Sequence, residues 1–261
     1  MSRLDATFAD LRSAGRPGLI AYVTAGDPDL ARSADVIRAV DRGGADVIEL
    51  GVPFSDPLAD GPVIQRATER ALAAGATLNG VLDLAASLSG TVRAPLVLFT
   101  YANPVLRLGI EAFAQRAAAA GVAGVLVLDL PPEEAVEAHA AFRRHGLDTI
   151  FLLSPTTTPA RIRRAAELGG GFLYGISRLG VTGVRDDVAD SARELAARVR
   201  AKTDRPLALG FGFSRPEHIR AVGQWADAAV VGSALVQVVA EHGRSADLAD
   251  QVERYVRWLR S

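Results

Sequence analysis

Several residue types and patterns are missing from this chain, and each absence removes a class of site. There is no cysteine, which excludes disulfides, thiolate metal sites and a cysteine nucleophile. The four histidines fall in or beside predicted helices and form no pair at zinc-ligand spacing, so we interpret them as surface residues and expect no metal site. The formal net charge is −1, too small a field to attract nucleic acid or an anionic membrane.

Long apolar runs are also missing. The first ten residues carry Arg3, Asp5 and Asp10 among apolar neighbours and lack the apolar core of a signal peptide. The longest apolar stretches, such as Val122–Leu128, are as long as a strand and too short to span a bilayer. Together with the absence of cysteine, these features lead us to expect a cytoplasmic protein that does not bind membranes.

The 261 residues include 49% hydrophobic residues, which is enough to build one large core. Short, nearly continuous apolar runs recur along the chain at even spacing, as is typical of parallel strands buried on both faces. The predicted strands are Leu19–Thr24, Val47–Leu50, Leu96–Tyr101, Gly124–Asp129, Thr149–Leu153, Gly171–Ser177, Leu207–Gly210 and Ala228–Val231.

Helical patterns lie between these runs, with one more before the first strand (Arg3–Ala14) and one at the end of the chain (Ala246–Leu259). Alternating strands and helices fit either a closed barrel or an open doubly wound sheet. The cycle of eight favours a (β/α)8 TIM barrel with extra N-terminal and C-terminal helices, and no G-x-G-x-x-G follows the first strand as a Rossmann sheet would require. No linker interrupts the chain, so we expect residues 1–261 to form a single domain.

Loops that follow the strands of such a barrel form its active face, and the second strand leads into the densest group of candidates. Glu49 interrupts an apolar run there, where burial would raise the pKa of its carboxyl into the range of a general acid or base. The plain alternative is a glutamate paired with an arginine or lysine. Asp56 and Asp60 follow on a loop stiffened by three prolines. Turn chemistry could account for both, and Asp60 could instead cap the next helix.

The last three loops suggest an anion site. Gly210 and Gly212 follow the seventh strand, and Gly232-Ser233 opens a helix after the eighth. Barrels often bind phosphate with these loops and a helix N-terminus, although tight turns alone would also explain the glycines. The stretch 178–187 contains Arg178 and Thr182 and is either a lid or a plain connector.

Taken together, these segments resemble one family. Residues 48–61 (IELGVPFSDPLADG) fill every specified position of the signature of the tryptophan synthase alpha subunit family. Further matching segments follow in order along the chain: Tyr22–Pro28, Tyr101–Pro104, Asp129–Pro131, Ser177–Gly183, Gly210–Ser214 and Gly232–Ala234.

The resemblance implies cleavage of indole-3-glycerol phosphate to indole and glyceraldehyde 3-phosphate without a cofactor. It implies that Glu49 shuttles protons and that Asp60 accepts the indole N–H. It assigns the remaining substrate contacts to Tyr22, Tyr101, Leu126, Leu152, Tyr174, Thr182 and Phe211, with Gly183, Gly212, Gly232 and Ser233 at the phosphate. Position 22 carries tyrosine where some relatives have phenylalanine.

The resemblance also implies a partner, a pyridoxal-phosphate-dependent beta subunit that receives indole through a tunnel in an α2β2 complex. The residues expected on that side are Pro53, Asp56, Asn103 and Pro104. Three alternatives stay open: a different phosphate-binding barrel isomerase, a lyase that works alone, and a barrel without activity that activates its partner. The presence of both Glu49 and Asp60 counts against the last.

Overall fold

The computed structural model describes residues 1–176 and 185–261, with the backbone alone for residues 185–189. Within these ranges, eight parallel strands pair in chain order and the last pairs with the first, so the sheet closes into a barrel. The strands are β1 (Gly18–Thr24), β2 (Val47–Gly51), β3 (Leu96–Thr100), β4 (Val122–Val127), β5 (Asp148–Leu153), β6 (Leu173–Ile176), β7 (Leu207–Gly210) and β8 (Ala228–Val231). The closed ring confirms the predicted barrel and excludes the open sheet.

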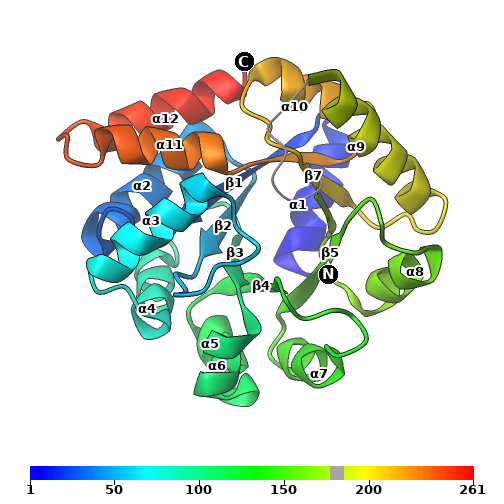
Figure 1. Ribbon diagram of the computed structural model, residues 1–261, viewed down its shortest axis with the longest axis horizontal. Coiled ribbons are helices and arrows are strands. Elements are labelled where there is room, and N and C mark those ends of the chain that lie inside the picture. Colours follow the sequence, from blue (N-terminus) through cyan, green and yellow to red (C-terminus); the bar gives the residue numbers. More distant parts are fainter. Residues whose placement is uncertain (177–184) are drawn as a thin grey trace.

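Figure 1 shows the helices as an outer ring around these strands, with α1 lying inside that ring. The described helices are α1 (Arg3–Ser13), α2 (Leu30–Gly43), α3 (Pro62–Ala73), α4 (Leu78–Leu88), α5 (Ala102–Leu108), α6 (Ile110–Ala119), α7 (Val136–Arg144), α8 (Pro159–Leu168), α9 (Arg185–Arg200), α10 (Pro216–Val222), α11 (Ser233–His242) and α12 (Leu248–Leu259). Helix α1 precedes the barrel and α12 follows the last barrel helix, as the sequence predicted.

The predicted bounds hold for β7 and β8 and are off by one residue at one end for β1, β2, β3 and β5. β6 begins two residues later and ends one residue earlier than predicted, and β4 is shifted as a whole. β4 runs from Val122 to Val127, two residues earlier than expected, because it begins directly after Gly121, which ends the preceding helical turn with a φ of +77°. Asp129 consequently lies beyond the strand. Its Oδ1 accepts a hydrogen bond of 2.7 Å from the backbone N–H of Ala102, at the start of α5.

Helix α1 closes the amino-terminal end of the barrel. Its buried side chains Leu4, Phe8 and Leu11 belong to the same apolar cluster as the interior strand residues, and the rings of Phe8 and Phe172 lie 5.4 Å apart. Ser2 and Asp5 form a capping box that starts the helix. Because α1 covers this end, a ligand has its access at the carboxyl ends of the strands.

Side chains along each strand alternate between the barrel interior and the helix layer. Tyr22 on β1 pairs in register with Glu49 on β2, and Glu49 pairs with Val97 on β3. These positions face the interior, whose apolar cluster includes Val97, Leu126 and Tyr174. The register therefore carries the carboxyl group of Glu49 into a mainly apolar space.

No single helix in the described residues has the length and apolarity to cross a membrane. Helices α3 and α4 reach that length only together, as a pair bent by 93°.

Candidate active site

Glu49 lies inside the barrel and is fully buried. Neither carboxyl oxygen has a hydrogen-bond partner among the described residues, and no arginine or lysine there pairs with it. Burial without a hydrogen bond or an ion pair disfavours the ionised form and raises the pKa of Glu49 from 4.5 to about 8. The salt-bridge alternative weighed from the sequence is therefore wrong for the described part of the chain, and at neutral pH the group is an acid.

Asp60 lies on the loop between β2 and α3, close to the end of β3. Its Oδ2 accepts a hydrogen bond of 3.2 Å from the hydroxyl of Tyr101, and that hydroxyl accepts one of 3.0 Å from the backbone N–H of Ala59. Burial raises the pKa of Asp60 to about 6, and the bond from Tyr101 opposes part of that rise. Helix α3 takes Gly61 as its N-cap and shows no side-chain capping bond, so Asp60 does not cap it.

The two acids share their aromatic neighbours. Burial raises the pKa of Tyr22, and the nearby negative charge of Asp60 adds to that effect. Burial likewise raises the pKa of Tyr174, with Glu49 as the next cause. Since both tyrosines sense both carboxyl groups, the four side chains surround one space at the mouth of the barrel.

The predicted apolar contacts come together with one exception. Leu126 and Tyr174 are buried in the interior cluster, and Leu152 packs against it, while Tyr22 lies in a small adjoining cluster. Phe211 does not join them, because it packs with Phe213 in the core between strands and helices, with ring centroids 6.2 Å apart. Residue 211 follows Gly210 by one position, and alternation after β7 turns it toward the helix layer.

Three apolar residues at this mouth were not predicted from the sequence. Phe99, Leu128 and Ile176 pack against the interior cluster beside Leu152. The continuous apolar runs concealed them, because such runs do not reveal which alternate positions face inward. The spacing of Phe99 two residues after Val97 was the available signal, since residues i and i+2 of a strand share a face.

Two of the residues predicted to bind phosphate, Gly232 and Ser233, lie at the start of α11. Gly232 is the N-cap, and no side chain caps the helix, so the first N–H groups of a ten-residue helix are available to an anion. Gly232 lies beside Tyr22: a Cβ on it would stand 3.6 Å from that of Tyr22. Gly212 has a φ of +74° with open space around it. Thr182 and Gly183 lie outside the described residues, as does Arg178.

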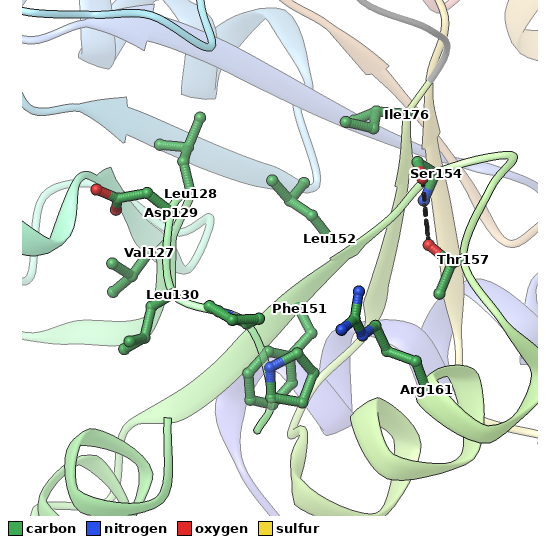
Figure 2. A pocket seen from close by; sticks show the side chains of 12 residues that line it. Val127, Leu128, Asp129, Leu130, Phe151, Leu152, Ser154, Thr157, Arg161 and Ile176 are labelled. Atoms are coloured by element: carbon green, nitrogen blue, oxygen red, sulfur yellow. Dashed lines mark hydrogen bonds between the residues drawn. The ribbon is translucent and has the colours of Figure 1, made fainter. Parts of the chain in front are cut away.

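A cavity of about 320 Å³ opens between the loops that follow β4 and β5. Figure 2 shows Leu128, Leu152 and Ile176 on the barrel side, and Arg161 of α8 on the far side. Arg161 forms an ion pair of 2.8 Å with Glu133. The cavity is thus a side extension of the apolar mouth.

The four residues expected to face a partner differ in exposure. Asp56 is exposed on the loop after β2, Asn103 is exposed in the first turn of α5, and Pro104 beside it is half-buried. Pro53 is buried two residues after the end of β2, so it is not a surface contact in this structure. The same loop presents Leu58, which is 89% exposed, over a second cavity of about 290 Å³ that reaches Leu72 on α3.

Comparisons with known proteins agree with this geometry. The family model for the tryptophan synthase alpha chain matches residues 8–259. The tryptophan synthase alpha chains of Solibacter usitatus and Geobacter sulfurreducens are 50% and 48% identical over 260 residues, covering 100% of this chain and 97% and 98% of theirs.

Solved structures match over the same length. Tryptophan synthase subunit alpha from Legionella pneumophila superposes with a TM-score of 0.91 at 35% identity, covering 100% of this chain and 97% of that one. Tryptophan synthase from M. tuberculosis in its aminoacrylate-bound form gives 0.90 at 37% identity, covering 100% and 98%. By sequence and by structure, the chain belongs to the tryptophan synthase alpha chain family.

Proposed function

We propose that Glu49 and Asp60 divide the work of cleaving indole-3-glycerol phosphate, the carbon–carbon lyase reaction of the family to which this chain belongs. The observation that carries the assignment is the environment of Glu49. It is the carboxyl group at the top of the barrel interior, it has no partner among the described residues, and its pKa is raised to about 8. A group that is protonated at neutral pH and close to its pKa can both give and accept a proton.

The chemical difficulty is that indole is a poor carbon leaving group. In the proposed sequence, Glu49 gives its proton to C3 of the indole ring, which converts the ring into an electron sink. The resulting carboxylate then takes the proton of the neighbouring side-chain hydroxyl. The bond between C3 and the side chain breaks, its electron pair returns to the ring, and an aldehyde remains on the phosphorylated fragment. Glu49 ends the cycle protonated, so no outside acid is consumed.

Asp60 would stabilise the positive charge that builds on the indole nitrogen after C3 is protonated. For this it must be ionised and must accept the N–H. Its pKa of about 6 leaves it mostly ionised at pH 7, whereas Glu49 is mostly protonated. Two carboxyl groups held at different pKa values by their surroundings can take these separate roles.

The rest of the substrate extends across the mouth of the barrel. We assign the indole ring to the wall formed by Tyr22, Leu126, Leu152 and Tyr174, and we place the phosphate at Gly212, Gly232 and the Ser233 end of α11. The helix dipole and the unpaired N–H groups support this placement. Tyr101 would contact the substrate while holding Asp60, and Thr182 and Gly183 complete the proposed set on the next loop.

The partner of the family is the beta subunit of tryptophan synthase, with which the alpha subunit works in tryptophan biosynthesis. We propose that the face around Asp56, Asn103 and Pro104 meets it in an α2β2 complex, and that Pro53 supports the loop from beneath. We further propose that residues 1–261 form one domain and that the protein works in the cytoplasm, in keeping with a biosynthetic family.

A direct assay of indole-3-glycerol phosphate cleavage tests the assignment. Glu49→Gln preserves the volume of the side chain but cannot transfer the proton, so we expect a folded protein that releases almost no indole, with and without the beta subunit. An indole release rate close to that of the parent chain would refute the role of Glu49.

A further inference from the structure

Phe99 is on β3, the strand next to the one that carries Glu49. Its partner in register on β2 is Gly51, which follows Glu49 by two residues and faces the same interior. Phe99 therefore stands one layer nearer the mouth of the barrel than Glu49. No side chain projects from Gly51, which leaves space for a neighbouring ring in the layer above Glu49.

Tyr22 reaches the same layer from the other side. Its backbone is level with Glu49, but its hydroxyl extends toward the mouth as far as Gly51, where a Cβ would stand only 2.0 Å from the hydroxyl oxygen. The rings of Tyr22 and Phe99 meet edge to face, with centroids 5.2 Å apart and planes at 76°. The contact between the two rings therefore requires glycine at position 51, because any larger residue would displace Tyr22.

Tyr174 adds a third ring to this group, and the charge of Glu49 contributes to the raised pKa of its hydroxyl. Phe99 and Tyr174 have ring centroids 6.4 Å apart. Beneath them Glu49 has 0% of its surface exposed, although it stands at the end of the barrel where substrate must enter. In the empty site the carboxyl group can therefore reach neither water nor substrate unless the rings or Glu49 itself move.

We propose that Phe99 and Tyr22 are positioning residues that shut Glu49 away from water in the empty site, so that it keeps its proton until the indole ring displaces them. The inference rests on the proposed function of Glu49. Indole is flat and aromatic, so it can replace the apolar contacts that the two rings give up. The proton is then protected from exchange until the substrate is in place.

The charged and titratable groups around Glu49 do not provide another explanation. Among the described residues, the titratable groups around the same space are Tyr22 on β1, Tyr174 on β6 and Asp60 on the loop after β2. The two hydroxyls are neutral at pH 7 and Asp60 is acidic. In the described part of the chain, no cation pairs with Glu49. Burial is the sole cause of the raised pKa of Glu49. Removing a covering ring should therefore act on Glu49 by admitting water.

The test is the titration of Glu49 followed by difference infrared spectroscopy, with each variant compared with its Glu49→Gln counterpart so that the carboxyl band is assigned. Phe99→Val suits a strand and removes most of the ring, and Phe99→Ala removes more. The matched control is Phe151→Val, the same truncation on β5 at a buried residue that faces the helix layer.

We expect the carboxyl group of Glu49 to titrate near 8 in the parent chain. Phe99→Val should lower that pKa by at least about one pH unit and Phe99→Ala by more, because hydration favours the ionised form. In Phe151→Val, Glu49 should titrate at the same pH as in the parent chain. The inference fails if the pKa of Glu49 in Phe99→Val equals that in the parent chain, or if Phe151→Val lowers this pKa by the same amount. Activity in Glu49→Gln would instead overturn the proposed function and leave this titration result standing.

Discussion

Tyr101 and Asp60 are joined by a hydrogen bond in which the hydroxyl of the tyrosine donates to Oδ2 of the aspartate over 3.2 Å. The same hydroxyl accepts the backbone N–H of Ala59, the residue before Asp60. Tyr101 therefore fixes both the loop after β2 and the carboxyl group that the loop carries. Its contribution lowers the pKa of Asp60, against the larger effect of burial.

Tyr101→Phe should consequently raise the pKa of Asp60 above its present value of about 6, because the ionised carboxylate loses a donor and stays buried. The acidic limb of the profile of kcat/KM against pH should move up by about 0.5 to 1 pH unit, the scale expected for one hydrogen bond. The profile of indole release measures it. An acidic limb that stays in place would show that the bond does not control ionisation.

Asp60→Asn tests the charge itself. The amide keeps the shape but cannot balance positive charge on the indole nitrogen, so kcat should fall by about 10² or more, the scale typical of losing one electrostatic contact to the transition state. Asp10→Asn, on the exposed face of α1, provides a control that loses one negative charge far from the mouth. Equal rates in the two variants would leave Asp60 as a structural residue of its loop.

Glu49 should also make the stability of the fold depend on pH. Its pKa is raised from 4.5 to about 8, so the folded chain retains a proton that the unfolded chain releases between these values. The contribution of Glu49 to the free energy of unfolding is fully present below about pH 4.5. It decreases as the pH rises toward 8 and then levels off.

Glu49→Gln has no such proton, so between pH 5 and pH 8 it should gain stability relative to the parent, on the order of a few kcal/mol. Urea unfolding at both pH values measures the difference. Parallel stability curves for the two proteins would contradict the raised pKa.

The phosphate site can be tested at the first residue of α11. Ser233→Asp places a carboxylate at a helix N-terminus, which suits the helix dipole but repels a bound phosphate. We expect the folded state to be as stable as the parent or more so, and the KM for indole-3-glycerol phosphate to rise by about tenfold or more. Ser233→Asn is the uncharged control and should raise the KM much less. An unchanged KM in Ser233→Asp would move the phosphate away from α11.

Much of this molecule was predictable from local pattern. The even recurrence of apolar runs indicates a parallel barrel because a strand buried on both faces has no polar positions. A glutamate that interrupts such a run at its end is conspicuous for the same reason, and the segment from Ile48 to Gly61 is long and specific enough to indicate the family. These inferences require only the identities of residues that are close together in the sequence.

Other features depend on which strands lie side by side. The partnerless burial of Glu49, the meeting of Tyr22 and Phe99 over Gly51, and the bond from Tyr101 to Asp60 each join segments separated along the chain. Tertiary packing also turned Phe211 toward the helices and buried Pro53, against expectation. The amino-acid order by itself determined the barrel, its family and the acids at its mouth. The closed sheet alone decided how those acids are covered and protonated, because burial and electrostatic surroundings arise only when distant strands pack together.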